Sequence, residues 1–155
     1  MTTNQRWGTD LRLLGDLETQ NSRCRENDLR LKKRPETGQW DLATLSEADN
    51  LKQALLLRFL TKSGELAVLG HPDYGSRLYE LLGRPNTETN RNRAKMFTLQ
   101  ALAAEPRVKE VLAVTVTTAP ADRSQINIRV SLRPIDSDTV LNLVFPFFLE
   151  GGPVP

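Results

Sequence analysis

The order of the predicted elements indicates an α+β domain in which three helices pack on a small antiparallel sheet. Helical periodicity is confined to the middle of the chain, from about residue 46 to residue 104. β-Branched residues and alternation follow it up to Phe148, and only short alternating pieces precede it. Elements segregated in this way are typical of α+β folds, with the helices on one face of the sheet.

The length of 155 residues fits a single domain, residues 1–155, with one hydrophobic core. Residues 1–40 are polar and form a partly irregular N-terminal extension, and the tail at 150–155 should be flexible. The formal net charge is only +2, which is far from the strongly basic balance of most nucleic-acid binders. We therefore expect no nucleic-acid partner.

The chain has one cysteine, Cys24, and one histidine, His71. An internal disulfide is impossible, and most zinc sites are excluded because they draw several ligands from Cys and His. We expect no metal, no cofactor and no special role for either residue. Residues 1–6 lack the apolar run of a secretory signal, and no stretch approaches the roughly 20 apolar residues of a membrane span. A cytoplasmic protein without membrane insertion is expected.

The N-terminal extension contains two short alternating pieces, 9–13 and 29–32, which place their leucines on one side. This pattern predicts short edge strands. The charged segment 21–28 is predicted to be an exposed loop, and residues 34–38 a turn.

The first predicted helix begins after Ser46, a plausible N-cap followed by acidic residues in the first turn. It should end near residues 62–64, where Gly64 can adopt a left-handed conformation. Its apolar face is wide, which implies burial against more than one neighbour, and comprises Leu51, Ala54, Leu55, Leu57 and Leu60.

Residues 65–69 are predicted to be a short strand or an extended link. A turn containing Pro72, Tyr74 and Gly75 follows, because proline excludes a helix there and glycine allows a sharp turn. Ser76 is then expected to cap a short second helix over 77–82.

The third helix is predicted over 88–104, with a basic first half that contains Arg91, Arg93 and Lys95. Pro106 should end it, because proline lacks an amide hydrogen and clashes with the preceding turn.

The remainder is predicted to be a three-stranded antiparallel meander over 108–117, 126–133 and 139–148, with turns at 120–124 and 134–138. The middle strand alternates cleanly, as expected for a strand with one solvated face. Pro146 indicates an edge strand or a bulge.

Several short motifs, in this order and spacing, resemble one family. They are Gly8-Thr9-Asp10-Leu11, Leu57-Arg58-Phe59-Leu60-Thr61, Gly64-Glu65-Leu66, Pro72-Asp73-Tyr74-Gly75-Ser76, Leu81-Leu82-Gly83, Glu105-Pro106-Arg107 and Leu143-Val144-Phe145-Pro146-Phe147. The family is that of the baseplate-wedge, sheath-initiator proteins of contractile injection systems. It includes the T-even phage wedge subunit and the type VI secretion subunit TssE. Residues 15–39 are longer and more polar than is usual in it.

The resemblance implies a structural, non-enzymatic subunit that nucleates a contractile sheath by sharing β-strands with the first sheath ring. The implied partners are the sheath protein and other wedge subunits, with inner-tube or spike-hub proteins as further candidates. The assembly would have hexameric symmetry, with six or more copies, and would form in the cytoplasm before the protein becomes part of the baseplate of a phage-tail-like particle.

Glu105, Pro106 and Arg107 are the predicted interface residues. Proline fixes the point where helix becomes strand, and a carboxylate at the negative end of a helix dipole needs a nearby cation. Arg107 or a partner protein would supply that cation, and its planar fork suits a carboxylate across an interface. Taken without the resemblance, the same residues fit an ordinary surface ion pair. Pro72, Tyr74 and Gly75 are predicted to have a structural role in their turn.

Two other functions remain as alternatives. A cell-wall hydrolase would use two carboxylates, one of them Glu105, although no spacing in the sequence supports a second. A nucleic-acid-binding module would use the basic helix around Arg91 and Arg93, against the low net charge.

Overall fold

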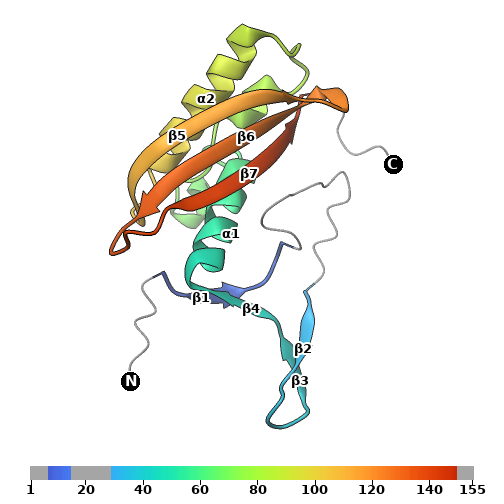
Figure 1. Cartoon of the computed structure of the whole chain (residues 1–155), viewed down its shortest axis with the longest axis vertical. Coiled ribbons are helices and arrows are strands. Elements are labelled where there is room, and N and C mark those ends of the chain that lie inside the picture. Colours follow the sequence, from blue (N-terminus) through green and yellow to red (C-terminus); the bar gives the residue numbers. More distant parts are fainter. Residues whose placement is uncertain (1–6, 15–28, 150–155) are drawn as a thin grey trace.

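A computed structural model describes residues 7–14 and 29–149 of the chain. The described part is an α+β fold with two α-helices and strands in three separate sheets (Figure 1). In chain order the elements are β1 (Thr9–Leu11), β2 (Leu31–Lys33), β3 (Trp40–Leu42), β4 (Thr44–Ser46), α1 (Glu47–Leu60), the 3₁₀ turns η1 (Ala67–Leu69) and η2 (Leu78–Leu81), α2 (Glu88–Ala103), β5 (Val108–Ala119), β6 (Asp122–Pro134) and β7 (Leu141–Phe148). The loop at 21–28, Cys24 and the tail at 150–155 lie outside the described residues.

The predicted C-terminal meander is confirmed. Strands β5, β6 and β7 form an antiparallel sheet in that order, with Val114 opposite Val130 and Val130 opposite Leu143. Alternate residues of β6 are buried, as the pattern of the sequence predicts. Pro146 lies in β7, which is an edge strand, so its missing amide hydrogen is tolerated.

The prediction of three helices is wrong, because the segment predicted as the second helix forms only the 3₁₀ turn η2. Its two buried side chains, Leu78 and Leu81, are three residues apart, and this spacing matches the three residues per turn of a 3₁₀ helix. The neighbouring glycines, Gly75 and Gly83, both have positive φ angles, so a right-handed helix is limited to the residues between them. Residues 67–69, predicted as extended, also form a 3₁₀ turn.

The short N-terminal strands also differ from the prediction, because they do not extend the C-terminal sheet. β1 pairs with β4, and β2 pairs with β3, as two separate two-stranded ribbons. Their partners come from residues 40–46, which carry no readable alternation because each strand is only three residues long.

The core lies between the C-terminal sheet and the two helices. α2 packs chiefly on β5, and α1 contacts both α2 and β7 (Figure 1). Leucines and phenylalanines of α1, η2 and α2 meet the buried side of β6 and β7 there, and Phe59 and Phe145 have ring centroids 5.6 Å apart.

Two buried amides of α1 hold the N-terminal segment on the body. Gln53 is 1% exposed, donates to Leu11 O and accepts from the backbone amides of Leu13 and Leu14 at 2.8 and 3.1 Å. Asn50 donates to Trp7 O at 2.9 Å. Because these bonds satisfy backbone groups that have no strand partner, the polar residues on this helix are structural.

Candidate functional site

The junction between α2 and β5 contains the predicted interface residues. α2 ends at Ala103, and a tight turn follows in which the amide of Val108 donates to Glu105 O at 3.1 Å. Pro106 cannot donate a backbone hydrogen bond, so the helix stops there and β5 begins two residues later. This fixed turn points the Glu105 side chain into the protein, where it is only 5% exposed.

The carboxylate of Glu105 is held by two arginines of its own chain. Its Oε2 accepts from Arg58 Nη2 at 3.0 Å, and its Oε1 accepts from Arg107 Nε at 2.6 Å. The Glu105 side chain is 4% exposed, that of Arg58 is 9% exposed, and that of Arg107 is 29% exposed. The three residues, which we call the Arg58–Glu105–Arg107 cluster, therefore form a mostly buried ion triad rather than a surface pair.

Arg58 is the residue of this cluster that the sequence reasoning missed. It lies in α1 on the same side as the fully buried Leu51 and Leu55, seven and three residues earlier. A charged residue on an otherwise apolar helix face was the available signal, because such a charge needs a buried partner. Its guanidinium also stacks over the ring of Tyr74, with 4.5 Å between the guanidinium carbon and the ring centroid.

Arg107 ties the cluster to two distant segments. Its Nη1 donates to Trp7 O at 3.5 Å, and its carbonyl accepts from the amide of Ile135 at 2.9 Å. Trp7 in turn donates its indole N–H to Ile135 O at 3.2 Å. The N-terminal segment, the α2–β5 junction and the β6–β7 turn consequently meet at one arginine, the most exposed member of the cluster.

The turn at 72–76 packs against the end of α1, which brings Tyr74 to the cluster. Ser76 donates its hydroxyl to Phe59 O at 2.9 Å, and its amide donates to Thr61 O, also at 2.9 Å. Gly75 has φ +109°, and a Cβ placed there would lie 2.7 Å from Thr61 O. Glycine is therefore required at this position for both reasons. Pro72 lies in the exposed part of the turn.

The electrostatics of the cluster favour an ionised carboxylate. Burial alone raises the pKa of Glu105, but the hydrogen bond and charge of Arg107, with the hydrogen bond from Arg58, hold this pKa below its usual value of 4.5. Burial raises the pKa of Tyr74, an effect that the charge of Arg58 opposes. The cluster is thus suited to rigid positioning and not to releasing a proton near neutral pH.

The structure separates the other residues singled out in the sequence from this cluster. His71 is exposed, and Arg91 is bonded to Asn86 Oδ1 at 2.8 Å at the beginning of α2. Within residues 7–14 and 29–149, no group of three His, Cys, Asp or Glu side chains is arranged to hold a metal ion. No helix in the same ranges is long and apolar enough to cross a membrane. The predicted interface role of Glu105, Pro106 and Arg107 stays a prediction. A partner could reach the part-exposed side chain of Arg107 more easily than the buried side chain of Glu105.

Comparison with solved structures shows a similarity to a tail-related protein. A Geobacter sulfurreducens protein, solved at 1.44 Å resolution and provisionally named a tail lysozyme, superposes with a TM-score of 0.60 at 27% sequence identity. The match covers 69% of this chain and 96% of that protein. No model of a known protein family and no curated protein sequence matches the chain. The chain is therefore similar in fold, and detectably in sequence, to a protein that has been named a tail lysozyme.

Proposed function

We propose that the chain is a structural component of the baseplate of a contractile, phage-tail-like machine, and more specifically a wedge subunit on which the sheath begins to assemble. The similarity to a protein named for a tail supports the general assignment. The ordered motifs of the sequence support the wedge assignment. The partners would be the sheath protein and other wedge subunits in a ring of hexameric symmetry, assembled in the cytoplasm.

The observation that carries the proposal is the open outer edge of β5. This strand has 12 residues and pairs only with β6 among the described strands, so its other edge presents unpaired backbone groups. Such an edge is a template on which another chain can add a strand. The opposite edge, that of β7, contains Pro146, which lacks one donor. We therefore assign strand sharing to β5.

A second feature supports an assembly protein. The β2–β3 ribbon extends away from the body (Figure 1), and its register places Leu31 opposite Leu42 and Lys33 opposite Trp40 on one face. The Trp40 side chain is 67% exposed, Leu31 is 61% exposed and Leu42 is 37% exposed. Apolar side chains gathered on one exposed face mark an interaction surface.

The name of the structural neighbour favours a second candidate, a cell-wall hydrolase. Glycosidases of this kind place two carboxylates on either side of the scissile bond, and the acid has a raised pKa. Glu105 is buried, and its pKa is lowered. A hollow between η2 and α2 has a single carboxylate, Glu80, in its lining. These observations favour the structural function. Release of fragments from purified peptidoglycan by the pure protein, lost in a Glu105→Gln protein that circular dichroism shows to be folded, would support the hydrolase instead.

The strand-sharing proposal is tested with a pair of proline substitutions in β5. The amides of neighbouring residues point to opposite edges of a strand, so one of Val116→Pro and Thr117→Pro breaks a bond to β6 and the other changes only the outer edge. The variant with the smaller loss of thermal stability identifies the outward amide. That variant should be folded and should fail to support sheath formation, seen by electron microscopy after co-expression with the sheath protein and the other wedge proteins.

Normal sheaths from the stable proline variant would contradict strand sharing at this edge. The interface role of the Glu105-Pro106-Arg107 motif is tested separately with Arg107→Gln, because the Arg107 side chain is 29% exposed whereas that of Glu105 is 4% exposed. The expected result is a folded protein that no longer enters the ring. Ring entry equal to that of the unchanged protein would remove Arg107 from the interface.

A further inference from the structure

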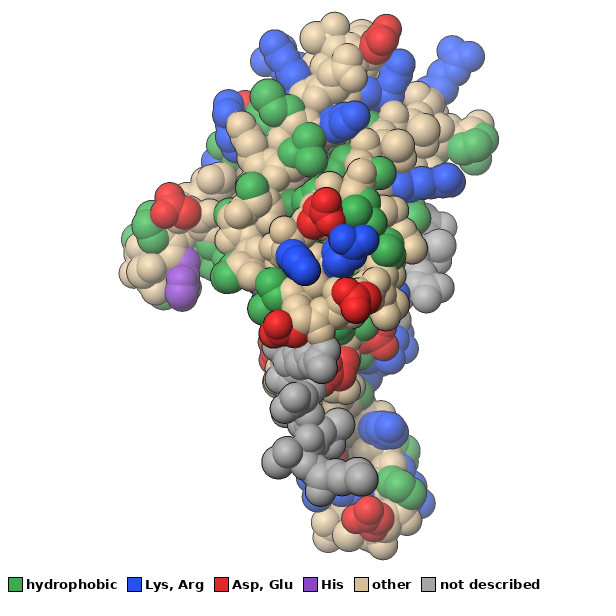
Figure 2. Space-filling model, turned by 60° about the vertical axis from the view of Figure 1, so that its left-hand side comes forward, with side chains coloured by type: hydrophobic (Ala, Val, Ile, Leu, Met, Phe, Trp, Pro, Cys, Tyr) green, Lys and Arg blue, Asp and Glu red, His purple; other side chains and the backbone are tan. Residues whose placement is uncertain are grey.

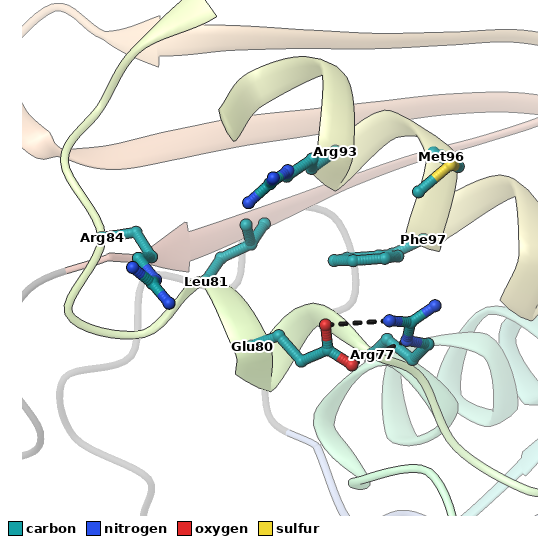
Figure 3. A pocket seen from close by; sticks show the side chains of 7 residues that line it. All are labelled: Arg77, Glu80, Leu81, Arg84, Arg93, Met96 and Phe97. Carbon is teal, nitrogen blue, oxygen red and sulfur yellow. Dashed lines mark hydrogen bonds and ion pairs between the residues drawn. The ribbon is translucent and has the colours of Figure 1, made fainter. Parts of the chain in front are cut away.

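A hollow of about 490 Å³ lies between η2 and the middle of α2, and no residue of the Arg58–Glu105–Arg107 cluster lines it (Figure 3). Its apolar surface is formed by Leu81, Met96 and Phe97. Leu81 and Phe97 are 1% and 4% exposed and give it a packed floor, whereas Met96 is 46% exposed at its rim. Its size falls within the range of ordinary ligand pockets.

One arginine of the hollow is fixed in place. Arg77 lies over the ring of Phe97 at 4.7 Å and is bonded to Glu80 at 2.7 and 3.0 Å, as the sticks in Figure 3 show. This ion pair lowers the pKa of Glu80 through the hydrogen bond from Arg77. Glu80 is therefore ionised and already paired with Arg77.

The other two arginines of the lining, Arg84 and Arg93, lie on either side of Leu81 (Figure 3). In the described part of the chain neither forms an ion pair with a carboxylate. Three arginines against one glutamate give the lining a net charge of +2. The charge of Arg93 also acts on Glu80 and lowers its pKa, but less than the hydrogen bond from Arg77 does. Figure 2 shows several Lys and Arg side chains at the top of the molecule, together with an acidic one.

We propose that this hollow binds a short acidic segment of a partner protein, in which a carboxylate side chain follows an apolar one. The apolar side chain would fill the space over Leu81 and Phe97, and the carboxylate would lie between Arg84 and Arg93. Arginine is suited to this role because its planar fork can donate two parallel hydrogen bonds to one carboxylate. The proposal goes beyond the baseplate function and does not depend on it.

The apolar floor favours a peptide over a nucleic acid. Proteins that bind single strands stack bases on free aromatic faces. The one aromatic ring of the hollow, Phe97, is buried and is covered by Arg77. A phosphate would find arginines here, but a base would find no exposed ring.

The proposal is tested by NMR titration of the full chain with the capped dipeptide acetyl-Leu-Glu-amide, with acetyl-Leu-Gln-amide as the uncharged control. We expect saturable shifts of the Leu81 and Met96 methyl signals with a Kd that is roughly millimolar, as is usual for a fragment of this size. The glutamine dipeptide should bind at least about tenfold more weakly, because it cannot offer a charged fork partner.

The matched variants are Arg93→Gln and Arg91→Gln, which remove the same charge from the same helix. Arg91 is bonded to Asn86 and does not line the hollow, so only Arg93→Gln should weaken the dipeptide, by about tenfold. Equal weakening by both variants would reduce the effect to general electrostatics and overturn the proposal. Three other results would also overturn the proposal. The dipeptide could give no saturable shifts, or a single-stranded oligonucleotide could bind more tightly at the same signals. The methyl signals could also shift with protein concentration alone, which would identify a second copy of the chain as the occupant.

Discussion

Glu105→Gln is the substitution whose effect the structure defines best. It keeps the size of the side chain and removes the charge that neutralises Arg58 and Arg107. The two charge-assisted bonds, at 3.0 and 2.6 Å, would each contribute about 1.5–3 kcal/mol. The Arg107 side chain is 29% exposed and can bind water once the carboxylate is lost, so its bond should lie at the low end of this energy range. The Arg58 side chain is only 9% exposed and cannot be solvated in this way. We expect a loss of about 3–5 kcal/mol in the free energy of unfolding, the usual result of breaking a buried ion pair.

The assay is urea unfolding at pH 7, followed by tryptophan fluorescence and by circular dichroism. Glu110→Gln is the control, because Glu110 pairs with Arg133 at 2.8 Å but has a side chain that is 52% exposed. A pair of this kind is worth no more than about 1 kcal/mol. If Glu105→Gln costs as little as Glu110→Gln, with unchanged dependence on urea, the cluster is solvated in solution and the reasoning from its burial is refuted.

The remaining predictions concern pH, one glycine and one buried amide. The pKa of Glu105 is lowered on folding, so the ionised carboxylate stabilises the folded protein fully at pH values well above its usual pKa of 4.5. This stabilisation is lost as the pH falls from there through the lowered pKa. The thermal midpoint should therefore fall more steeply over this range in the unchanged protein than in Glu105→Gln. Gly75→Ala should cost at least about 2 kcal/mol, measured by thermal unfolding, because backbone lies 2.7 Å from the new Cβ. Gly70 also has a positive φ of +87° but nothing within 4 Å of a Cβ placed there, so Gly70→Ala should cost only about 1 kcal/mol. Equal losses of stability in the two alanine variants would show that the backbone near Gly75 moves to relieve its contact with the new Cβ. Gln53→Leu should leave three backbone groups of residues 11–14 without their hydrogen-bond partner and cost about 2–4 kcal/mol of the free energy of unfolding. The N-terminal segment should then be cleaved faster by protease. Unchanged proteolysis would show that the Gln53 hydrogen bonds are not needed to hold this segment.

The elements with a long regular period were predictable from the sequence. The 16-residue helix α2 and the 13-residue strand β6 each present enough turns or alternations to fix their type. The short elements were not predictable, because a three-residue strand such as β3 contains hardly one period. The sequence does not distinguish the 3₁₀ turn η2 from a short α-helix, because a run of four residues fits either geometry.

The candidate site was only partly predictable for a related reason. The sequence by itself determined that a helix ends at Pro106 and that Glu105 needs a cation, since both follow from local backbone chemistry. Which cation it takes was decided by the tertiary structure, which brings Arg58 of α1 within 3.0 Å across 47 positions of the chain and places Tyr74 over it. The same packing buried the carboxylate and turned the expected surface ion pair into an internal one. Local rules act over a few residues, whereas burial and charge pairing depend on which elements pack together, and only the folded chain decides that.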